Sequence, residues 1–421
     1  MPTLTAPTRA AVPTEPYVAA FEDFLKTDAA KDASWLRALR ESAFAHFVEQ
    51  GFPTTRHEEW KYTSVAPITK LPFKLSSSAL SEVEGSSSNQ IEDIFSDLSR
   101  AHLARYARCD ANPFVALNTA FFTDGAVIRI PKGKVVTEPI RLVFAAPESG
   151  ATVHPRILII AEENSQASII EHFVGNGTTP YFTNTVTEIV VGEGATVEHI
   201  KIQEESASAF HIATIQAQLA RNANFTSHSI SLGAKLARNN INLVLASEGI
   251  EAILNGLYLA GGDQLMDHHT VADHTAPHCN SHEFYHGILG GRARGVFNGK
   301  IFVRQAAQKT DAKQTNRNLL LSKTATVDTK PQLEIFADDV KCTHGATVGQ
   351  LDENAIFYLR SRGIHEKEAR RILTQAFASE IINRIKVESV RNSLGKTIEA
   401  RLGELVGRVT SHGELDQGNN P

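Results

Sequence analysis

Short runs of β-branched and aromatic residues, separated by polar corners, fill the centre of this 421-residue chain. Between residues 113 and about 350 these runs are rich in Val, Ile, Phe and Thr, and Gly, Asn and Asp interrupt them, which is typical of strands joined by turns. Similar segments place Ala167, Ala195, Ala223 and Glu251 at equivalent positions, each separated from the next by the same number of residues. Because one coil cannot bury its apolar face alone, such a constant step predicts stacked coils, as in a parallel β-helix or a related β-solenoid.

A helical pattern flanks this region on both sides. Between residues 17 and 50 the apolar residues recur at steps of three and four, which predicts two amphipathic helices, the second ending at Gly51. After Gly363 an apolar stripe predicts another long helix, and a further helix is expected near Ile398 to Val409. The predicted fold is therefore mainly β, with a β-solenoid core between two helical parts.

These patterns divide the chain into segments. We expect a disordered, Pro/Ala/Thr-rich N-terminus over 1–16, an N-terminal helical subdomain over 17–112 with a flexible Ser-rich loop at 76–90, a β-helix core over 113–362, a C-terminal helical subdomain over 363–410, and a tail over 411–421. Within the core, Ile189 and Leu254 are expected to point inward.

Composition limits the partners and the compartment. Lys and Arg number 42 against 47 Asp and Glu, a net charge of -5, so no basic excess favours nucleic acid or an anionic membrane surface. No stretch of about 18 consecutive apolar residues occurs that would predict a membrane span. The three cysteines are too few and too scattered for a disulfide framework, which predicts a reducing, cytoplasmic location.

No enzyme motif is complete in the sequence. The run LGKT at 394–397 would need a glycine at Val390 to form a phosphate-binding loop, and it lies in a helical context. The glycine-rich run GILGGRARG at 287–295 lacks the helix and acidic partner of a dinucleotide fold. Nothing resembles a serine nucleophile elbow. The chain is therefore expected to be non-enzymatic.

The first candidate site is the pair Cys342 and His344 in DDVKCTHGATVG. If this stretch is extended, the two side chains lie on the same face, because strand side chains repeat every two residues. A thiol and an imidazole suit iron, zinc or copper. Two ligands do not complete a four-coordinate site, so a strand that enters a turn at Gly345 remains the alternative interpretation.

A second candidate is the histidine-rich run MDHHTVADHTAPHCNSHEFYHG, which extends from Met266 to Gly287. Two interpretations are open: a solvated or stacked ladder of imidazoles, or a metal site. The candidate ligands of that metal site are His268, His269, His274, His278 and Cys279.

The segment TRHEEWKYTSVAP, which includes Trp60, also has two interpretations. It could provide a binding surface with an aromatic anchor, or it could be a packed loop whose charges are paired, since Trp and Tyr usually bury with their polar tips satisfied.

Four segments carry a resemblance to a known family. KCTHGATVGQLDENAIFYLRSRGI at 341–364, RHEEWKYTSV at 56–65, VVGEGATVEHI at 190–200 and VFNGKIFVRQAAQKTDAKQTNRNLLLS at 296–322 resemble the SufB/SufD family of the SUF iron-sulfur cluster assembly system. The run CTHGATVG is similar to the SufD branch rather than to SufB.

The resemblance implies a right-handed parallel β-helix and a scaffold subunit that pairs with SufB. It further implies that the ATPase SufC docks on the C-terminal helices, for which we select Glu366, Glu368, Arg370 and Arg371. Transient iron or a nascent cluster, shared with SufB, is expected near His344 and the neighbouring Cys342, with no tightly bound cofactor. A homodimer is an alternative assembly for the isolated subunit. The contrasting hypothesis is a metal-dependent β-helix enzyme that uses the His268–His286 cluster.

Overall fold

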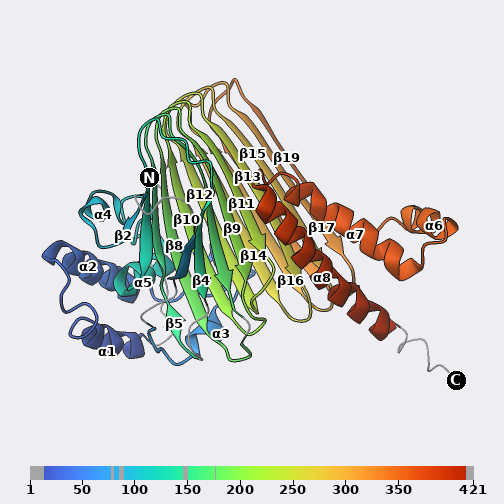
Figure 1. Ribbon diagram of the computed structural model, residues 1–421, viewed down its shortest axis with the longest axis horizontal. Helices are drawn as coiled ribbons and strands as arrows, with labels where there is room; N and C mark the ends of the chain where they lie inside the picture. The colour runs from blue at the N-terminus through green and yellow to red at the C-terminus, as the bar shows by residue number, and fades with distance from the viewer. Residues whose placement is uncertain (1–13, 77–79, 85–89, 146–149, 176, 414–421) are drawn as a thin grey trace.

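The computed structural model describes residues 14–76, 80–84, 90–145, 150–175 and 177–413. Its centre is a β-solenoid built from two long sheets, one on each side of a shared interior (Figure 1). One sheet has nine strands in the order β1-β4-β7-β9-β11-β13-β15-β17-β19, and the other has ten in the order β18-β16-β14-β12-β10-β8-β6-β3-β2. The chain alternates between the sheets, so each coil adds one parallel strand to each of them. The predicted mainly β solenoid is confirmed.

The strands have the following bounds: β1 Leu80–Glu84, β2 Ile91–Asp93, β3 Gly125–Ile130, β4 Ile140–Ala145, β5 Thr152–Val153, β6 Arg156–Ala161, β7 Gln166–Val174, β8 Phe182–Val191, β9 Thr196–Glu204, β10 Phe210–Leu219, β11 Asn224–Ser231, β12 Leu236–Leu245, β13 Glu251–Ala260, β14 Leu265–His274, β15 Asn280–Leu289, β16 Arg294–Val303, β17 Asp311–Leu320, β18 Thr326–Ile335 and β19 Lys341–Gly349. The helices are α1 Glu15–Phe24, α2 Ser34–Gln50, the 3-10 helix η1 Glu58–Trp60, α3 Ala66–Thr69, α4 Asp97–His102, α5 Pro113–Phe121, α6 Glu353–Ser361, α7 Glu366–Ile382 and α8 Glu388–Gly413.

The register of the strands corrects the predicted repeat. Phe225 lies beside Val197, as the predicted step requires, but Val197 lies beside Ala167 where the same step would place Ile169. The step from Phe225 to Ala252 is shorter than predicted, and the step from Ser281 to Ala312 is longer. Corner turns can accept extra residues without altering the strand pairing, so a fixed period is not required.

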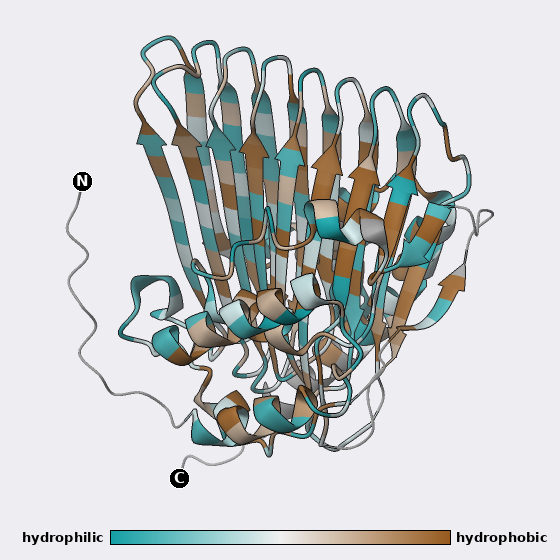
Figure 2. Ribbon diagram, turned by 90° about the vertical axis from the view of Figure 1, so that its left-hand side faces the viewer, coloured by the Kyte–Doolittle hydropathy of each residue, from teal (hydrophilic) through white to brown (hydrophobic). Residues whose placement is uncertain are grey.

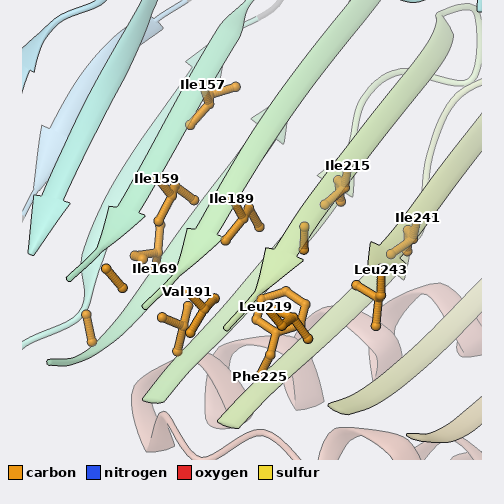
Figure 3. Close-up of a cluster of buried hydrophobic side chains, with 14 of the residues drawn as sticks. Ile157, Ile159, Ile169, Ile189, Val191, Ile215, Leu219, Phe225, Ile241 and Leu243 are labelled. Atoms are coloured by element: carbon orange, nitrogen blue, oxygen red, sulfur yellow. The ribbon is translucent and has the colours of Figure 1, made fainter. Parts of the chain in front are cut away.

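The interior of the solenoid has an apolar half and a polar half. In the apolar half, inward Ile, Leu, Val and Phe side chains from successive coils stack on one another (Figure 3). Ile189 and Leu254 belong to this cluster and are almost fully buried, so their predicted inward orientation is confirmed. In the polar half, Lys201 Nζ lies 2.7 Å from His211 Nε2, and burial lowers the pKa of Lys201 to about 8 while Glu171 and Glu205 oppose that shift.

Helices cover the outer faces of the two sheets. The N-terminal helices pack an aromatic-rich cluster against the outer face of the ten-stranded sheet, and α7 and α8 cover the nine-stranded sheet (Figure 1). Along the strands, hydrophobic and hydrophilic residues intermingle, and many of the polar residues are buried (Figure 2). The two helices predicted between residues 17 and 50 are α1 and α2, and Gly51, whose φ is 64°, follows the last residue of α2 as its C-cap.

Several predicted boundaries need correction. The Ser-rich segment 76–90 contains strand β1, which pairs antiparallel with β4, because Leu80 can pack against the core while the strand covers an otherwise open edge. Helices α5 and α6 lie inside the predicted core range 113–362, and β2 lies inside the predicted helical range 17–112. Residues 1–13 of the predicted disordered N-terminus and 414–421 of the predicted tail lie outside the described residues. Helix α1 starts at Glu15, within the segment predicted to be disordered, and α8 extends to Gly413, within the predicted tail.

Candidate functional site at the terminal rung

The last coil of the solenoid leaves its strands open on one side. Strands β18 and β19, which we call the terminal rung, are the last strands of their sheets. Exposed apolar side chains lie on or directly after these strands: Ile335 on β18, Phe336 next to it and Val348 on β19 are 39%, 58% and 47% exposed. An open strand edge with exposed apolar groups is a template for another chain, so the terminal rung has the character of an interface.

The candidate residues Cys342 and His344 both lie on β19. Cys342 lies beside Ala312 and His344 lies beside Gln314 on strand β17. Because Ala312 and Gln314 are buried inside the solenoid, their partners on β19 face the same interior. The strand continues through Gly345 to Gly349, so the alternative of a turn at Gly345 is wrong.

The environments of the two candidate residues differ. Cys342 is half-buried and packs with a small apolar cluster that includes Ile301 and Ala337, and burial raises the pKa of its thiol. His344 is exposed at the open end, where an incoming group can reach its ring.

The interior directly below His344 is polar, which the sequence did not reveal. Gln314 and Glu283 follow His344 in register down the inner face of the nine-stranded sheet. Burial raises the pKa of Glu283 to about 7, against the lowering effect of hydrogen bonds from Thr270 and Gln314. The coil repeat is the sequence signal that could have identified these residues, because counting back one coil at a time from His344 leads to Gln314 and then to Glu283.

The histidine-rich run does not gather into one site. His268 and His274 point into the solenoid, where burial lowers the pKa of His268 to about 3 and that of His274 to about 4. His269 instead lies next to Asp267 and Glu59 on the outer face of the ten-stranded sheet. His278 sits in a turn with a φ of 58°.

The remaining members of that run lie on the other sheet or at a corner. Buried Cys279 is directed at the backbone carbonyls of Ser247 and Pro277, and His286 lies beneath helix α7, 3.0 Å from the carbonyl oxygen of Phe377. Over the part of the chain that the structure describes, no group of three or more His, Cys, Asp or Glu side chains could hold a metal ion. The side chains proposed for a metal site are therefore spread over several surfaces.

The segment around Trp60 packs against the outer face of the ten-stranded sheet. The guanidinium of Arg238 lies 3.8 Å from the Trp60 ring centroid and pairs with buried Asp267 at 2.8 Å. Thr63 donates a hydrogen bond to the same carboxylate, and Glu58 pairs with Lys330. The interpretation as a packed loop is confirmed for Trp60, which is buried, and its paired charges are confirmed for Glu58 and Glu59.

The C-terminal helices present a second candidate surface. Phe357 and Tyr358 on α6 are 72% and 57% exposed, and α6 projects away from the strands (Figure 1). The four residues that we selected on α7 form ion pairs within this chain: Arg370 with Glu366 and Glu353, and Arg371 with Glu368 and Glu399. The exposed aromatic pair was missed because its apolar side chains fit a buried helical stripe equally well.

A large groove lies elsewhere, between α8 and a row of solenoid corners. Its volume is about 960 Å³, and Lys235, Gly261, Arg292 and Leu405 contribute to its lining. None of the residues selected from the sequence lines it. Among the helices that the structure describes, none is both long enough and apolar enough to cross a membrane.

Comparisons with known proteins find matches over most of the chain. Residues 144–377 match a family model described as "SUF system FeS cluster assembly, SufBD core domain", and residues 12–84 and 78–142 match "SufBD protein N-terminal region". The chain is 34% identical to an iron-sulfur cluster assembly SufBD family protein of Synechocystis, over 83% of this chain and 87% of that protein. It is 33% identical to the iron-sulfur cluster assembly protein SufD of Escherichia coli, over 84% and 90%. It is 25% identical to SufD of Bacillus subtilis, over 90% and 98%.

Proposed function

This chain belongs to the SufBD family of the SUF iron-sulfur cluster assembly system, and we propose that it is a non-enzymatic scaffold subunit of the SufD type. The family gives the chain a role in iron-sulfur cluster assembly. In our proposal it pairs with SufB, docks the ATPase SufC, and helps to acquire iron for a nascent cluster. We assign it to the cytoplasm, where its free cysteines stay reduced.

The open terminal rung carries the proposal. SufB would add its own strands to the free edges of β18 and β19 and cover the exposed Phe336 and Val348. Such pairing would bring the inner face of β19, with Cys342 and His344, to the junction between the subunits. Iron or a nascent cluster is then cargo held between two chains, with His344 as an iron ligand or proton acceptor and Cys342 as a ligand or sulfur acceptor.

The test of this proposal is the variant His344→Ala. Because His344 is exposed, its removal leaves no buried cavity, and we expect normal folding and normal binding to SufB and SufC. Cluster content and maturation of a target apoprotein, measured on the purified complex, should fall several-fold. Cys342→Ser should reduce them less, because the Cys342 thiol is half-buried and the exposed His344 ring is the group that an incoming iron reaches first. Serine nearly preserves the side-chain volume but is a poor soft ligand, so any loss in Cys342→Ser reports a chemical role of the thiol.

Thr343→Ala is the matched control, because Thr343 lies on the same strand, is exposed and faces outward. It should assemble clusters as the wild type does. Wild-type yields from both His344→Ala and Cys342→Ser, in complexes of normal composition, would contradict the proposed site.

For SufC we propose docking on the surface formed by α6 and the polar flank of α7. The exposed Phe357 and Tyr358 would supply the apolar centre, since aromatic anchors dominate binding energy at interfaces. The ion pairs of Glu366, Glu368, Arg370 and Arg371 would form the rim, where exposed charges affect association and specificity more than affinity.

Phe357→Ala is expected to weaken SufC binding by about 2 kcal/mol or more, roughly 30-fold in Kd, because an exposed anchor is lost without a change in the core. Arg371→Glu should have a smaller effect that decreases as salt increases. Calorimetry with purified SufC measures both. The control is Phe95→Ala, which removes an aromatic ring of 42% exposure at a distant surface. Equal affinities for Phe357→Ala and the wild type would show that the docking surface is misplaced.

A further inference from the structure

A column of polar side chains leads from the interior of the solenoid to His344. Glu283 on β15, Gln314 on β17 and His344 on β19 are consecutive partners in register. Strands that pair in parallel lie about 4.8 Å apart and point their partner side chains to the same face. Glu283 and Gln314 are 1% and 2% exposed, so the lower part of the column is buried, whereas His344 is exposed at the terminal rung.

The Gln314 amide is held from below and from the opposite sheet. Its Nε2 donates to Glu283 Oε2 at 3.1 Å, and Thr270 Oγ1 on β14 donates to the same oxygen at 2.7 Å. Gly299, on the neighbouring strand β16, makes room for the amide, because a Cβ there would come within 2.2 Å of Gln314 Nε2. The amide nitrogen of Gln314 is thus held by its hydrogen bond to Glu283.

The acceptor atom of the Gln314 amide, Oε1, is not used in these contacts. Gln314 Oε1 is buried and has no hydrogen-bond partner among the described residues. Leaving a buried acceptor unpaired is unfavourable, so a donor that can approach Gln314 Oε1 is expected to bind it. The next inward side chain in the column is His344, and every protonation state of an imidazole offers at least one N–H donor.

We propose that Gln314 is a positioning residue for His344: its Oε1 accepts a hydrogen bond from the protonated ring nitrogen and thereby fixes the tautomer and orientation of the imidazole. The other ring nitrogen is then left with its lone pair toward the subunit junction. Glu283 and Thr270 hold the amide in the orientation that this requires. Histidines that bind metals generally donate their second N–H to a fixed acceptor, so the arrangement matches the role proposed above for His344, on which this inference rests.

The direct test is the tautomer of His344 in the full chain labelled with ¹⁵N in its histidines, with the resonance assigned by its loss in His344→Gln. At a pH where the ring is neutral, the wild type should show one pyrrole-like and one pyridine-like nitrogen. In Gln314→Met, which nearly preserves side-chain volume and removes the acceptor, the two resonances should move toward an exchange average. Unchanged resonances in Gln314→Met would overturn the proposal.

Two further variants keep the test decisive. Asn316→Leu is the matched control, because Asn316 is the next inward residue of β17 but lies beside Ala346 instead of a histidine, so the His344 resonances should not move. Thr270→Val removes the hydrogen bond that Thr270 donates to Glu283 and leaves Gln314 unchanged, so it should shift the His344 resonances in the same direction as Gln314→Met. Thr270→Val replaces Gln314→Met as the test if Gln314→Met does not fold. No shift in Thr270→Val would likewise count against the column.

Cluster assembly separates this inference from the proposed function. If Gln314→Met changes the His344 resonances and lowers cluster content in the SUF complex, both are supported. If the resonances change while cluster content stays at the wild-type level for both Gln314→Met and His344→Ala, the positioning role stands and the proposed function of His344 fails. If cluster content falls without a change in the tautomer, the positioning role is overturned.

Discussion

Replacing Ile189 by aspartate is expected to abolish the folded solenoid at physiological temperature. Ile189 lies on β8, fully buried, between Ile159 on β6 and Ala217 on β10 (Figure 3). A charge there has no partner within the apolar half of the interior, and an unpaired buried charge costs several kcal/mol in addition to the lost apolar burial. Domains are stable by only about 5–15 kcal/mol, so this single change removes much of the total.

Because neighbouring coils share one core, the loss should spread through the whole solenoid rather than remain in one coil. Thermal and denaturant unfolding followed by circular dichroism measures it. The matched control is Val190→Asp, one residue along the same strand on the outer face, where Val190 is only half-buried and the carboxylate can reach water. That variant should lose much less stability. Similar melting curves for Ile189→Asp and the wild type would mean that the coils do not share a cooperative core.

The solenoid was predictable because its strands and corners have different compositions. The register of the strands was not predictable, because the corner turns differ in length and the number of residues between paired positions therefore changes from coil to coil. The alignment of Ala167 with Ala195 shows the limit: two small residues match in sequence, yet Ala167 pairs with Val197 in space. The step from Phe225 to Ala252 differs from the predicted step by one residue, and a one-residue slip reverses which side chains face inward, so sequence repeats alone do not assign the interior.

The elements that were missed have specific physical causes. Helix α5 is buried at nearly every position, so its sequence PFVALNTAF lacks the polar face that marks an amphipathic helix and reads as a buried strand. Its start at Pro113 is marked by Asn112, whose side chain accepts a hydrogen bond from the Phe114 amide. Strand β1 was hidden by the serines on both sides of Leu80–Glu84.

The candidate site, like the fold, could be predicted only in part from the sequence. That Cys342 and His344 share one face follows from local alternation, and the strand β19 provides that alternation. The residues beneath them are separated by about one coil of sequence each, so Gln314 and Glu283 could be recognised only from the pairing of β15, β17 and β19. The histidine-rich run shows the converse, because residues close in sequence point to opposite faces of a sheet.

Removing the Glu188 carboxylate is the second change with a large expected effect. Glu188 on β8 is fully buried and pairs at 2.5 Å with Arg156 on β6, which is also fully buried. The same carboxylate accepts hydrogen bonds from the backbone amides of Ala104, Tyr106 and Ala107, which lie between α4 and α5. One side chain thus joins the N-terminal helical region to the outer face of the ten-stranded sheet.

Glu188→Ala should therefore destabilise the chain by about 3–5 kcal/mol, the usual cost of leaving one member of a buried ion pair without its partner, with a further contribution from the three unpaired amides. Denaturant unfolding of the full chain measures the loss. Glu162→Ala is the matched control, because Glu162 pairs with Arg129 at 2.6 Å on the surface, where such a pair contributes less than about 1 kcal/mol.

The double variant Glu188→Ala/Arg156→Met distinguishes the unpaired charge from the lost amide contacts. Methionine removes the guanidinium and keeps an apolar side chain, so the double variant should recover the part of the loss that comes from the uncompensated Arg156. The remaining loss then measures the three backbone hydrogen bonds that tie residues 104–107 to β8. If the double variant is no more stable than Glu188→Ala, the destabilisation comes from those amides and from the contacts of Arg156 with Asn118 and Thr119, and not from an unpaired charge.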